Sequence, residues 1–525
     1  MEKVKKLVVN YWLTISNWVR KNPVEFGLLV VIIAVASFLR FYKISGYMTF
    51  LGDEGRDAII VRRLLVNKDP ILIGPGTSIG NMYLGPLYYY LIAPSLWLFK
   101  FSPVGPSAFV AFLGVITVIF VYLVGKEWFS PKAGLIAAAL YAISPVVITY
   151  SRSSWNPNVM PFFSLLCIYS IWKVWKKRKF VWLIVSAISL AFALQSHYLG
   201  LLLIPVMAFF WALTFFAASA RGEDIDEKAQ ITLFLKNTFI SVFLFLFLMS
   251  PLAIFDARHG LINFNAMKKF FLERQTTVSA KPWNAIPKVP ELLTAITARL
   301  ITAREIKFGE IILAVVSIPS ILLTLGRKRL HKNEASGFTV LFVWLLVALI
   351  GLGIYKQEIY DHYYGFFFAA PFLFLGGFID GISENLSKFG KGLLGVGLLA
   401  IIGVNIYNSP LKGPPNMQLQ RAQEVSQKIE EESKGKPFNL AVLAERNYED
   451  GYQYFLEKDG YPVVDIDAQT PESITDQLFA VCELPHEKCD PTHSPKAEVA
   501  NFGWSKVINQ WEVYGVQLYK LIHTQ

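Results

Sequence analysis

The sequence predicts an α-helical polytopic membrane protein with about 11 transmembrane helices and a small C-terminal α/β domain. Hydrophobic residues make up 54% of the 525 residues and charged residues only 17%. The apolar residues occur in long runs separated by short charged loops. Soluble domains carry about 25% charged residues, so this composition excludes a soluble globular protein.

The formal net charge of +11 does not indicate a nucleic-acid partner. Lys and Arg gather in short clusters beside apolar runs, where anionic lipid and the positive-inside bias account for them. We therefore expect contact with membrane lipid and no nucleic acid. The basic, amphipathic residues 1–22 are typical of a retained cytoplasmic interfacial helix.

Each spanning helix needs about 20 mainly apolar residues. Spans are expected near 24–41, 105–125, 133–150, 159–175, 180–197, 199–217, 233–254, 308–325, 337–355, 363–380 and 391–408. The basic loops at 176–179 and 326–332 belong on the cytoplasmic side. This topology predicts a multi-pass protein of the plasma (inner) membrane, with a cytoplasmic N-terminus and an extracytoplasmic C-terminal domain.

Residues 82–101 are apolar enough for a span, but a crossing here would put both basic loops outside. Pro86, Pro94 and several aromatic residues suit an interface, so we expect this segment to lie along the membrane or re-enter it. A conventional span with a different downstream topology is the alternative. The first external loop then covers about 42–104. A second, about 256–306, is basic and amphipathic and is a candidate roof or acceptor-binding element.

The first external loop opens with the acidic motif "GDEGRD" at 52–57. Apolar residues spaced four apart after it predict an amphipathic surface helix, with Asp53 and Glu54 at its N-terminus. Helix capping explains one carboxylate there. A second one at the mouth of a membrane cavity favours catalysis. Arg56 is close enough in sequence to pair with one of the two acids.

The other external loops also contain polar residues at the outer ends of predicted spans. Each alone is compatible with snorkelling, packing or an aromatic belt. Together they indicate a shared polar site at the outer membrane face. These candidates are Arg152, Asn156, His197, Arg258, His259, His362 and Tyr363.

Five segments in the first 260 residues, including "LGDEGRDA", "YSRSSWNPNVMPFF" and "FDARHG", carry a family resemblance. In order and spacing they resemble motifs of the C-type glycosyltransferases that use polyprenyl-phosphate donors, such as the protein O-mannosyltransferases and the aminoarabinose transferases of lipid A. The acidic motif is the diagnostic one. The resemblance implies a C-type glycosyltransferase fold, membrane-parallel helices in the first external loop, and a glycan, lipid or protein acceptor.

Such a transfer needs a base and a pocket that stabilises an anion. The resemblance implies Asp53 as the base, with Glu54 orienting or binding the acceptor. Arg56, Arg152 and Arg258 are expected around the donor phosphate, because guanidinium groups match its oxygens and stay charged. The other five polar candidates, Asn156, His197, His259, His362 and Tyr363, are expected to be weaker phosphate or substrate ligands. A single displacement would invert the anomeric carbon.

Oligosaccharyltransferase subunits resemble the "YSRSSWNPN" region but have a D-x-D there that binds a divalent metal. This chain has Asn156 and Asn158 instead, and amides suit Mg²⁺ or Mn²⁺ less well than carboxylates do. We therefore expect metal-independent transfer without a cofactor, and not N-glycosylation.

Residues 409–525 have a soluble α/β pattern. Strands are expected at 438–445, 461–467 and 511–522, and a helix at 448–460. Cys482 and Cys489 are expected to form a disulfide on the oxidising side of the membrane. A zinc site that includes His486 is the alternative. Cys167 lies within a predicted span and is expected to pack there.

Two other functions fit a multi-span chain: a transporter or flippase of lipid-linked glycans, and a polysaccharide polymerase. The polar residues lie at the outer ends of the spans rather than at the midplane, and no matching hydrophobic halves are visible. Both observations favour a transferase over a transporter.

Overall fold

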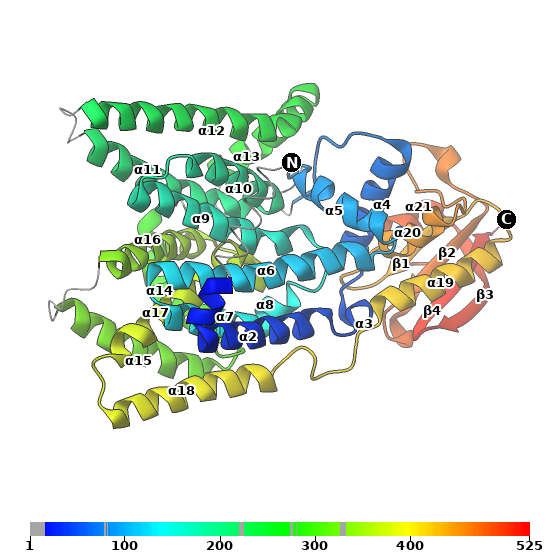
Figure 1. Ribbon diagram of the computed structural model, residues 1–525. Helices are drawn as coiled ribbons and strands as arrows, with labels where there is room; N and C mark the ends of the chain where they lie inside the picture. The colour runs from blue at the N-terminus through cyan, green and yellow to red at the C-terminus, as the bar shows by residue number, and fades with distance from the viewer. Residues whose placement is uncertain are drawn as a thin grey trace.

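The computed structural model describes residues 16–77, 80, 82–219, 225–273, 277–279, 281–325 and 332–524. A bundle of long helices has a small sheet domain at one end (Figure 1). Most of the interfacial helix predicted over 1–22, and the basic loop at 326–331, lie outside the described residues.

Each of the predicted spans contains a helix. They are α2 (Pro23–Phe41), α6 (Val104–Trp128), α7 (Pro131–Ile143), α9 (Met160–Lys177), α10 (Trp182–Ser196), α11 (Leu203–Ser219), α12 (Ile225–Arg258), α15 (Ile306–Leu325), α16 (Lys332–Ile354), α17 (Ala369–Ser383) and α18 (Lys388–Tyr407). Helices α2, α6, α12 and α18 run roughly parallel (Figure 1).

Among the described residues, six helices are long and apolar enough to cross a membrane, or seven if the bent pair η5 (Asp361–Phe367) and α17 forms one span. Helices α7 and α10 are shorter, with 13 and 15 residues. A helical membrane protein is therefore confirmed, and the number of crossings stays a prediction.

Helix packing in the bundle uses close backbone contacts. Helices α6 and α7 meet at Gly125 and Gly134, where a Cβ added to Gly125 would lie 2.7 Å from the Gly134 Cα. Small residues permit such an approach between helices that have no hydrophobic driving force in lipid. The buried aromatic and aliphatic side chains of α6, α7, α9, α16 and α17 form the main core around this contact.

The first external loop contains α3 (Ile44–Tyr47), α4 (Gly52–Asn67) and α5 (Leu87–Leu98). Helix α4 is the surface helix that the sequence predicts. With 12 residues, α5 is about 18 Å long, which is shorter than the hydrocarbon core of about 30 Å. Its length therefore agrees with a segment that does not cross the membrane as a conventional span.

The second external loop contains α13 (Ile262–Leu272), η3 (Pro282–Lys288), α14 (Val289–Ile296) and the single π turn η4 (Thr297–Ile301). The Asp256 carboxylate accepts the backbone N–H groups of Asn263 (2.6 Å) and Phe264 (3.1 Å). Asp256, in the "FDARHG" segment, thus caps the start of α13.

The C-terminal domain contains helices α19 (Gln418–Ser433), α20 (Asp450–Lys458) and α21 (Ala497–Phe502). Its strands are β1 (Asn439–Leu443), β2 (Gln477–Cys482), β3 (Ser505–Val513) and β4 (Val516–His523), in the order β1-β2-β4-β3. The β1–β2 pair is parallel, and the other two pairs are antiparallel.

Three details of this domain differ from the prediction. Residues 461–467 form no strand, and only Val463 makes a single bridge to Phe438. Pro462 has no N–H to donate to a ladder, which disfavours a strand here. The expected strand at 511–522 is a hairpin that turns at Tyr514 and Gly515, both with positive φ. Strand β2 was not predicted.

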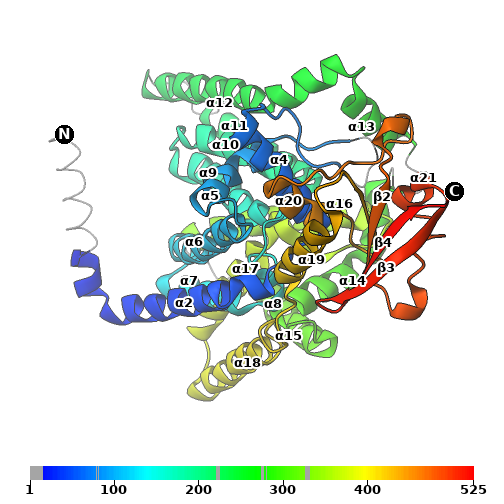
Figure 2. The same cartoon turned by 90° about the vertical axis from the view of Figure 1, so that its right-hand side faces the viewer.

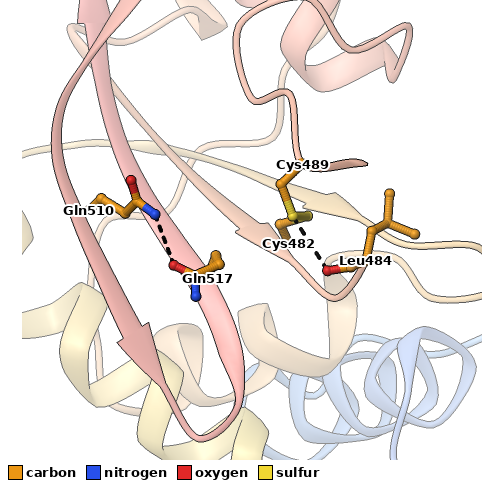
Figure 3. Close-up of a disulfide and its surroundings, with 5 residues drawn as sticks. All are labelled: Cys482, Leu484, Cys489, Gln510 and Gln517. Atoms are coloured by element: carbon orange, nitrogen blue, oxygen red, sulfur yellow. Dashed lines mark hydrogen bonds between the residues drawn. A yellow bond between two sulfur atoms is a disulfide. The ribbon is translucent and has the colours of Figure 1, made fainter. Parts of the chain in front are cut away.

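Cys482, at the end of β2, is joined to Cys489 by a disulfide (Figure 3). The alternative zinc site would need both of these cysteine sulfurs, and both are part of the disulfide. The free Cys167 is buried in α9, and its Sγ lies 3.4 Å from the Met207 sulfur. Cys167 therefore packs within the bundle, as expected.

The C-terminal domain is fixed on the first external loop by a shared hydrophobic core. Met48, Phe50, Ala58 and Ile59 of the loop pack with buried side chains of the domain, including Leu419, Val425, Tyr452 and Phe455. Helix α20 lies against α4 (Figure 2). The domain thus covers the helix that begins with the acidic motif.

Candidate active site

Asp53, the second residue of α4, has a partly exposed carboxylate, with 42% of the side chain accessible. Its Oδ1 accepts hydrogen bonds from Arg56 Nη1 (2.8 Å) and Tyr448 Oη (2.6 Å). These bonds both fall on Oδ1, so Oδ2 is left to meet another donor. The predicted pairing of Arg56 with one of the two acids is therefore present.

Asp57 extends this network on the buried side of α4. Its Oδ1 accepts hydrogen bonds from Arg56 Nη2 (2.8 Å) and Tyr89 Oη (3.2 Å), whereas Oδ2 is buried without a hydrogen-bond partner. Only 1% of Asp57 is exposed, so this carboxylate lies on the buried side of α4, although the sequence pattern puts Asp57 on the charged face of the helix, opposite its apolar stripe. Burial raises the pKa of Asp57 to about 6, although Arg56 opposes this change.

Glu54 is buried, in contrast to Asp53. Its Oε2 accepts the Leu51 backbone N–H (3.0 Å), which fixes the first turn of α4. The side chain lines a narrow crevice with Ile92, Pro106 and Ser154. Burial raises the pKa of Glu54 to about 7; Leu51 opposes this change and the Asp53 charge adds to it. This geometry suits a carboxyl group that positions α4.

Glu54→Gln is expected to flatten the pH dependence of thermal stability in detergent micelles. The raised pKa means that the folded state holds the Glu54 proton more tightly than the unfolded state does. This contribution to stability is fully present below about pH 4.5 and is lost as the pH rises through about 7. Gln stays neutral and can still accept the Leu51 N–H. Above pH 7 the variant should be more stable than wild type, by on the order of 3 kcal/mol at most. Equal slopes of Tm against pH would contradict this.

Residues of the C-terminal domain border the Asp53 site next to Gly52 and Asp53. Asn447 Oδ1 accepts the Gly52 N–H (2.8 Å), and Asn447 Nδ2 donates to Glu483 (2.6 Å). Burial raises the pKa of Asp450, the first residue of α20, to about 7, and the Glu449 charge adds to this increase. Sequence reasoning did not find Asn447 or Tyr448, which lie in an unremarkable loop after β1.

Three predicted residues meet in an aromatic cluster. The His197 ring centroid lies 5.6 Å from His362 and 5.2 Å from Tyr363, and His362 lies 4.7 Å from Trp155. Burial of the His362 ring disfavours its charged form, and the electrostatic field of the Asp361 and Asp53 carboxylates opposes this effect. The structure thus brings the outer ends of α9, α10 and α17 toward the acidic motif.

Arg152 and Asn156 instead donate hydrogen bonds to backbone carbonyls at the ends of helices. Arg152 donates to the backbone carbonyls of Leu39 and Tyr42, the latter at 2.6 Å, at the end of α2. Asn156 Nδ2 donates to the Ser196 carbonyl (2.7 Å) at the end of α10. These carbonyls have no partner within their helices, so the contacts are structural ones. The expected placement of Arg152 around a phosphate stays a prediction.

Asp361 is held by two arginines that the sequence did not single out. Arg299 Nη1 lies 2.7 Å from Asp361 Oδ1, and Arg304 Nη2 lies 2.5 Å from Oδ2. Asp361 is buried. These ion pairs fasten the second external loop to the segment that carries His362 and Tyr363.

A cavity of about 990 Å³ lies beneath α13, in the second external loop. The predicted residues His259 and Tyr363 both line it, whereas Arg258 is exposed at the end of α12. Its wall combines aromatic rings, amides, Lys269 and two carboxylates, groups that suit a phosphorylated saccharide. The remaining lining includes Asn265, Phe270, Glu273, Tyr355, Gln357, Glu358 and Tyr360.

Within the described ranges, no group of three or more His, Cys, Asp or Glu side chains is arranged to hold a metal ion.

The chain is similar to a known family over part of its length, and to solved structures in its fold. Residues 84–254 match the family model described as dolichyl-phosphate-mannose-protein mannosyltransferase. No curated protein matches the chain.

Solved structures of two proteins share the fold. ArnT from Cupriavidus metallidurans, bound to undecaprenyl phosphate, is 12% identical with a TM-score of 0.58, and the match covers 94% of this chain and 98% of ArnT. The apo oligosaccharyltransferase of Archaeoglobus fulgidus is 14% identical with a TM-score of 0.50, and the match covers 85% of this chain and 65% of that protein. The predicted C-type fold and the resemblance to C-type glycosyltransferases are confirmed, and the family match supports a membrane glycosyltransferase.

Proposed function

We propose that this protein transfers a sugar from a polyprenyl-phosphate donor to an acceptor at the extracytoplasmic membrane face. The main support is the partly exposed Asp53 carboxylate, held by Arg56 at the N-terminus of α4. The fold shared with ArnT, whose structure contains undecaprenyl phosphate, supports a polyprenyl-phosphate ligand.

In the proposed reaction, Asp53 Oδ2 takes the proton of an acceptor hydroxyl. The acceptor oxygen then bonds to the anomeric carbon as the bond from that carbon to the phosphate oxygen breaks. Polyprenyl phosphate leaves with the electron pair, and the single displacement inverts the configuration. Arg56 stabilises the ionised carboxylate beforehand, because a guanidinium group is charged at every physiological pH.

The cavity beneath α13 is the proposed place for the sugar phosphate of the donor. Lys269 and His259 supply cationic or hydrogen-bonding groups, and Tyr355, Tyr360 and Tyr363 supply aromatic surfaces for a sugar ring. Tyr363 is adjacent to His362, and the imidazole of His362 lies within electrostatic range of Asp53. This connection supports a donor that reaches from the cavity toward the base.

The basic loops support the proposed orientation in the membrane. The proposal places Asp53, the second external loop and the disulfide-bonded C-terminal domain outside, and the N-terminus in the cytoplasm. We also propose that Asp53 acts as the base without a divalent metal, since Asn156 and Asn158 stand where related oligosaccharyltransferases have carboxylates.

The purified protein should consume at least one member of a panel of radiolabelled polyprenyl-monophosphate sugars, with release of polyprenyl phosphate. Dialysis against EDTA should leave the rate unchanged, and loss of activity that Mn²⁺ restores would contradict the metal-free mechanism. Sealed vesicles containing the protein serve as the control for transport. Uptake of a labelled lipid-linked glycan without transfer would favour a flippase and overturn the proposed function.

A further inference from the structure

We infer that Tyr448, in the C-terminal domain, is a positioning residue for the transfer reaction. Its hydroxyl fixes the Asp53 carboxylate so that Oδ2 meets the acceptor hydroxyl. This inference rests on the function proposed above and gives the C-terminal domain a part in the chemistry.

The contacts form a closed triangle at one carboxylate oxygen. Tyr448 Oη and Arg56 Nη1 both donate to Asp53 Oδ1, at 2.6 and 2.8 Å, and Arg56 Nη1 lies 3.3 Å from Tyr448 Oη. Two donors from different elements restrict rotation of the carboxylate more than one donor does. Burial and the nearby Asp53 keep the pKa of Tyr448 well above its usual value, although Arg56 opposes this, so the phenol remains a donor.

Gly52, at the start of α4, leaves room for the Tyr448 ring. A Cβ added to Gly52 would lie 2.5 Å from this ring, so only glycine permits the observed contact. The Gly52 N–H donates to Asn447, and Asn447 in turn donates to Glu483 at the end of β2. Tyr452 also donates to Glu483 (2.6 Å). The Tyr448 N–H also donates to Asn447 Oδ1 (2.9 Å), so this chain of hydrogen bonds from the sheet holds the Tyr448 backbone beside Gly52.

The position of Tyr448 also depends on rigid docking of the whole domain. Arg63 of α4 pairs with Glu457 of α20 (2.6 Å), and Met417 N–H donates to the Gly46 carbonyl (2.9 Å). These contacts join the first external loop to the domain on two sides of Asp53. Catalytic groups lose efficiency when displaced by about 1 Å, so a rigid platform is what a positioning residue requires.

Tyr448→Phe in the full-length protein tests this role, with Tyr454→Phe as the matched control. Tyr454 donates to the Phe101 carbonyl across the same interface but does not contact Asp53. Tyr448→Phe is expected to lower kcat roughly 10- to 100-fold with unchanged KM for the donor and acceptor. Tyr454→Phe should leave kcat and KM at the wild-type values. Thermal unfolding of both variants shows whether docking is retained.

The outcomes separate this inference from the proposed function. Wild-type kcat in Tyr448→Phe, with active wild-type protein, would overturn the positioning role and leave the transferase proposal intact. A parallel loss of kcat in both variants would show a purely structural hydroxyl and would also overturn the role. Wild-type protein that transfers no sugar from any donor in the panel would overturn both proposals together.

Discussion

Asp53→Asn is expected to lower kcat about 10³-fold, because the substitution removes the base but preserves the shape of the side chain. The Asn carbonyl oxygen can still accept the hydrogen bonds of Arg56 and Tyr448, so α4 should remain in place. A neutral amide cannot take the acceptor proton. Initial rates with saturating polyprenyl-phosphate sugar measure the effect, and binding of the donor should change little.

Asp459→Asn is the control for this experiment. Asp459 is an exposed acid that follows α20 and pairs with Lys458 at 2.9 Å, so its neutralisation changes the charge of the domain without touching α4. It should retain the wild-type rate. Turnover by Asp53→Asn at the wild-type rate would remove Asp53 from the role of base, whatever the identity of the acceptor.

The local part of the site was predictable because helix geometry links residues three positions apart. The sequence therefore indicated both α4 and the pairing of Arg56 with a neighbouring acid. The contact between Tyr448 and Asp53 could not be predicted from helix geometry. It joins residues 395 positions apart, and neither periodicity nor charge in the loop after β1 indicates that it reaches α4.

Residue type does not by itself distinguish structural from chemical roles at the outer ends of the spans. Arg152 and Asn156 were selected because polar side chains are costly near a membrane. In the structure their donors satisfy backbone carbonyls where α2 and α10 end. Backbone carbonyls at a helix end need hydrogen-bond donors, and so does a bound substrate. The sequence alone therefore does not distinguish a structural donor from a substrate-binding one.

The C-terminal sheet shows where strand prediction reaches its limit. Strand β2 is buried along its whole length, so its apolar run "QLFAVC" lacks the alternation that identifies a half-buried strand. The hairpin was read as one strand because its Tyr-Gly turn lies inside a continuous β-favouring run. The first error concerns a strand whose two faces are covered by partners distant in sequence, whereas the second concerns a local turn between adjacent strands.

Gly55→Ala is expected to separate the C-terminal domain from the first external loop. A Cβ on Gly55 would lie 2.4 Å from the backbone carbonyl of Asp450 and the backbone nitrogen of Gly451, and backbone atoms cannot rotate away. Helix α20 must therefore shift from α4, which breaks the Tyr448–Asp53 contact as well. We expect a loss of about 1–3 kcal/mol in stability and a fall in kcat at least as large as that of Tyr448→Phe.

The expected loss of stability in Gly55→Ala is opposite to the change that intrinsic helix propensity alone predicts. Ala in the middle of a helix is favoured over Gly by about 1 kcal/mol, so α4 alone would gain stability from the substitution. Gly381→Ala in α17 is the matched control, because a Cβ there meets nothing within 4 Å. Thermal unfolding, and proteolysis of the 409–417 linker, would report the separation. A stabilised and fully active Gly55→Ala protein would show that α20 and α4 are not in rigid contact.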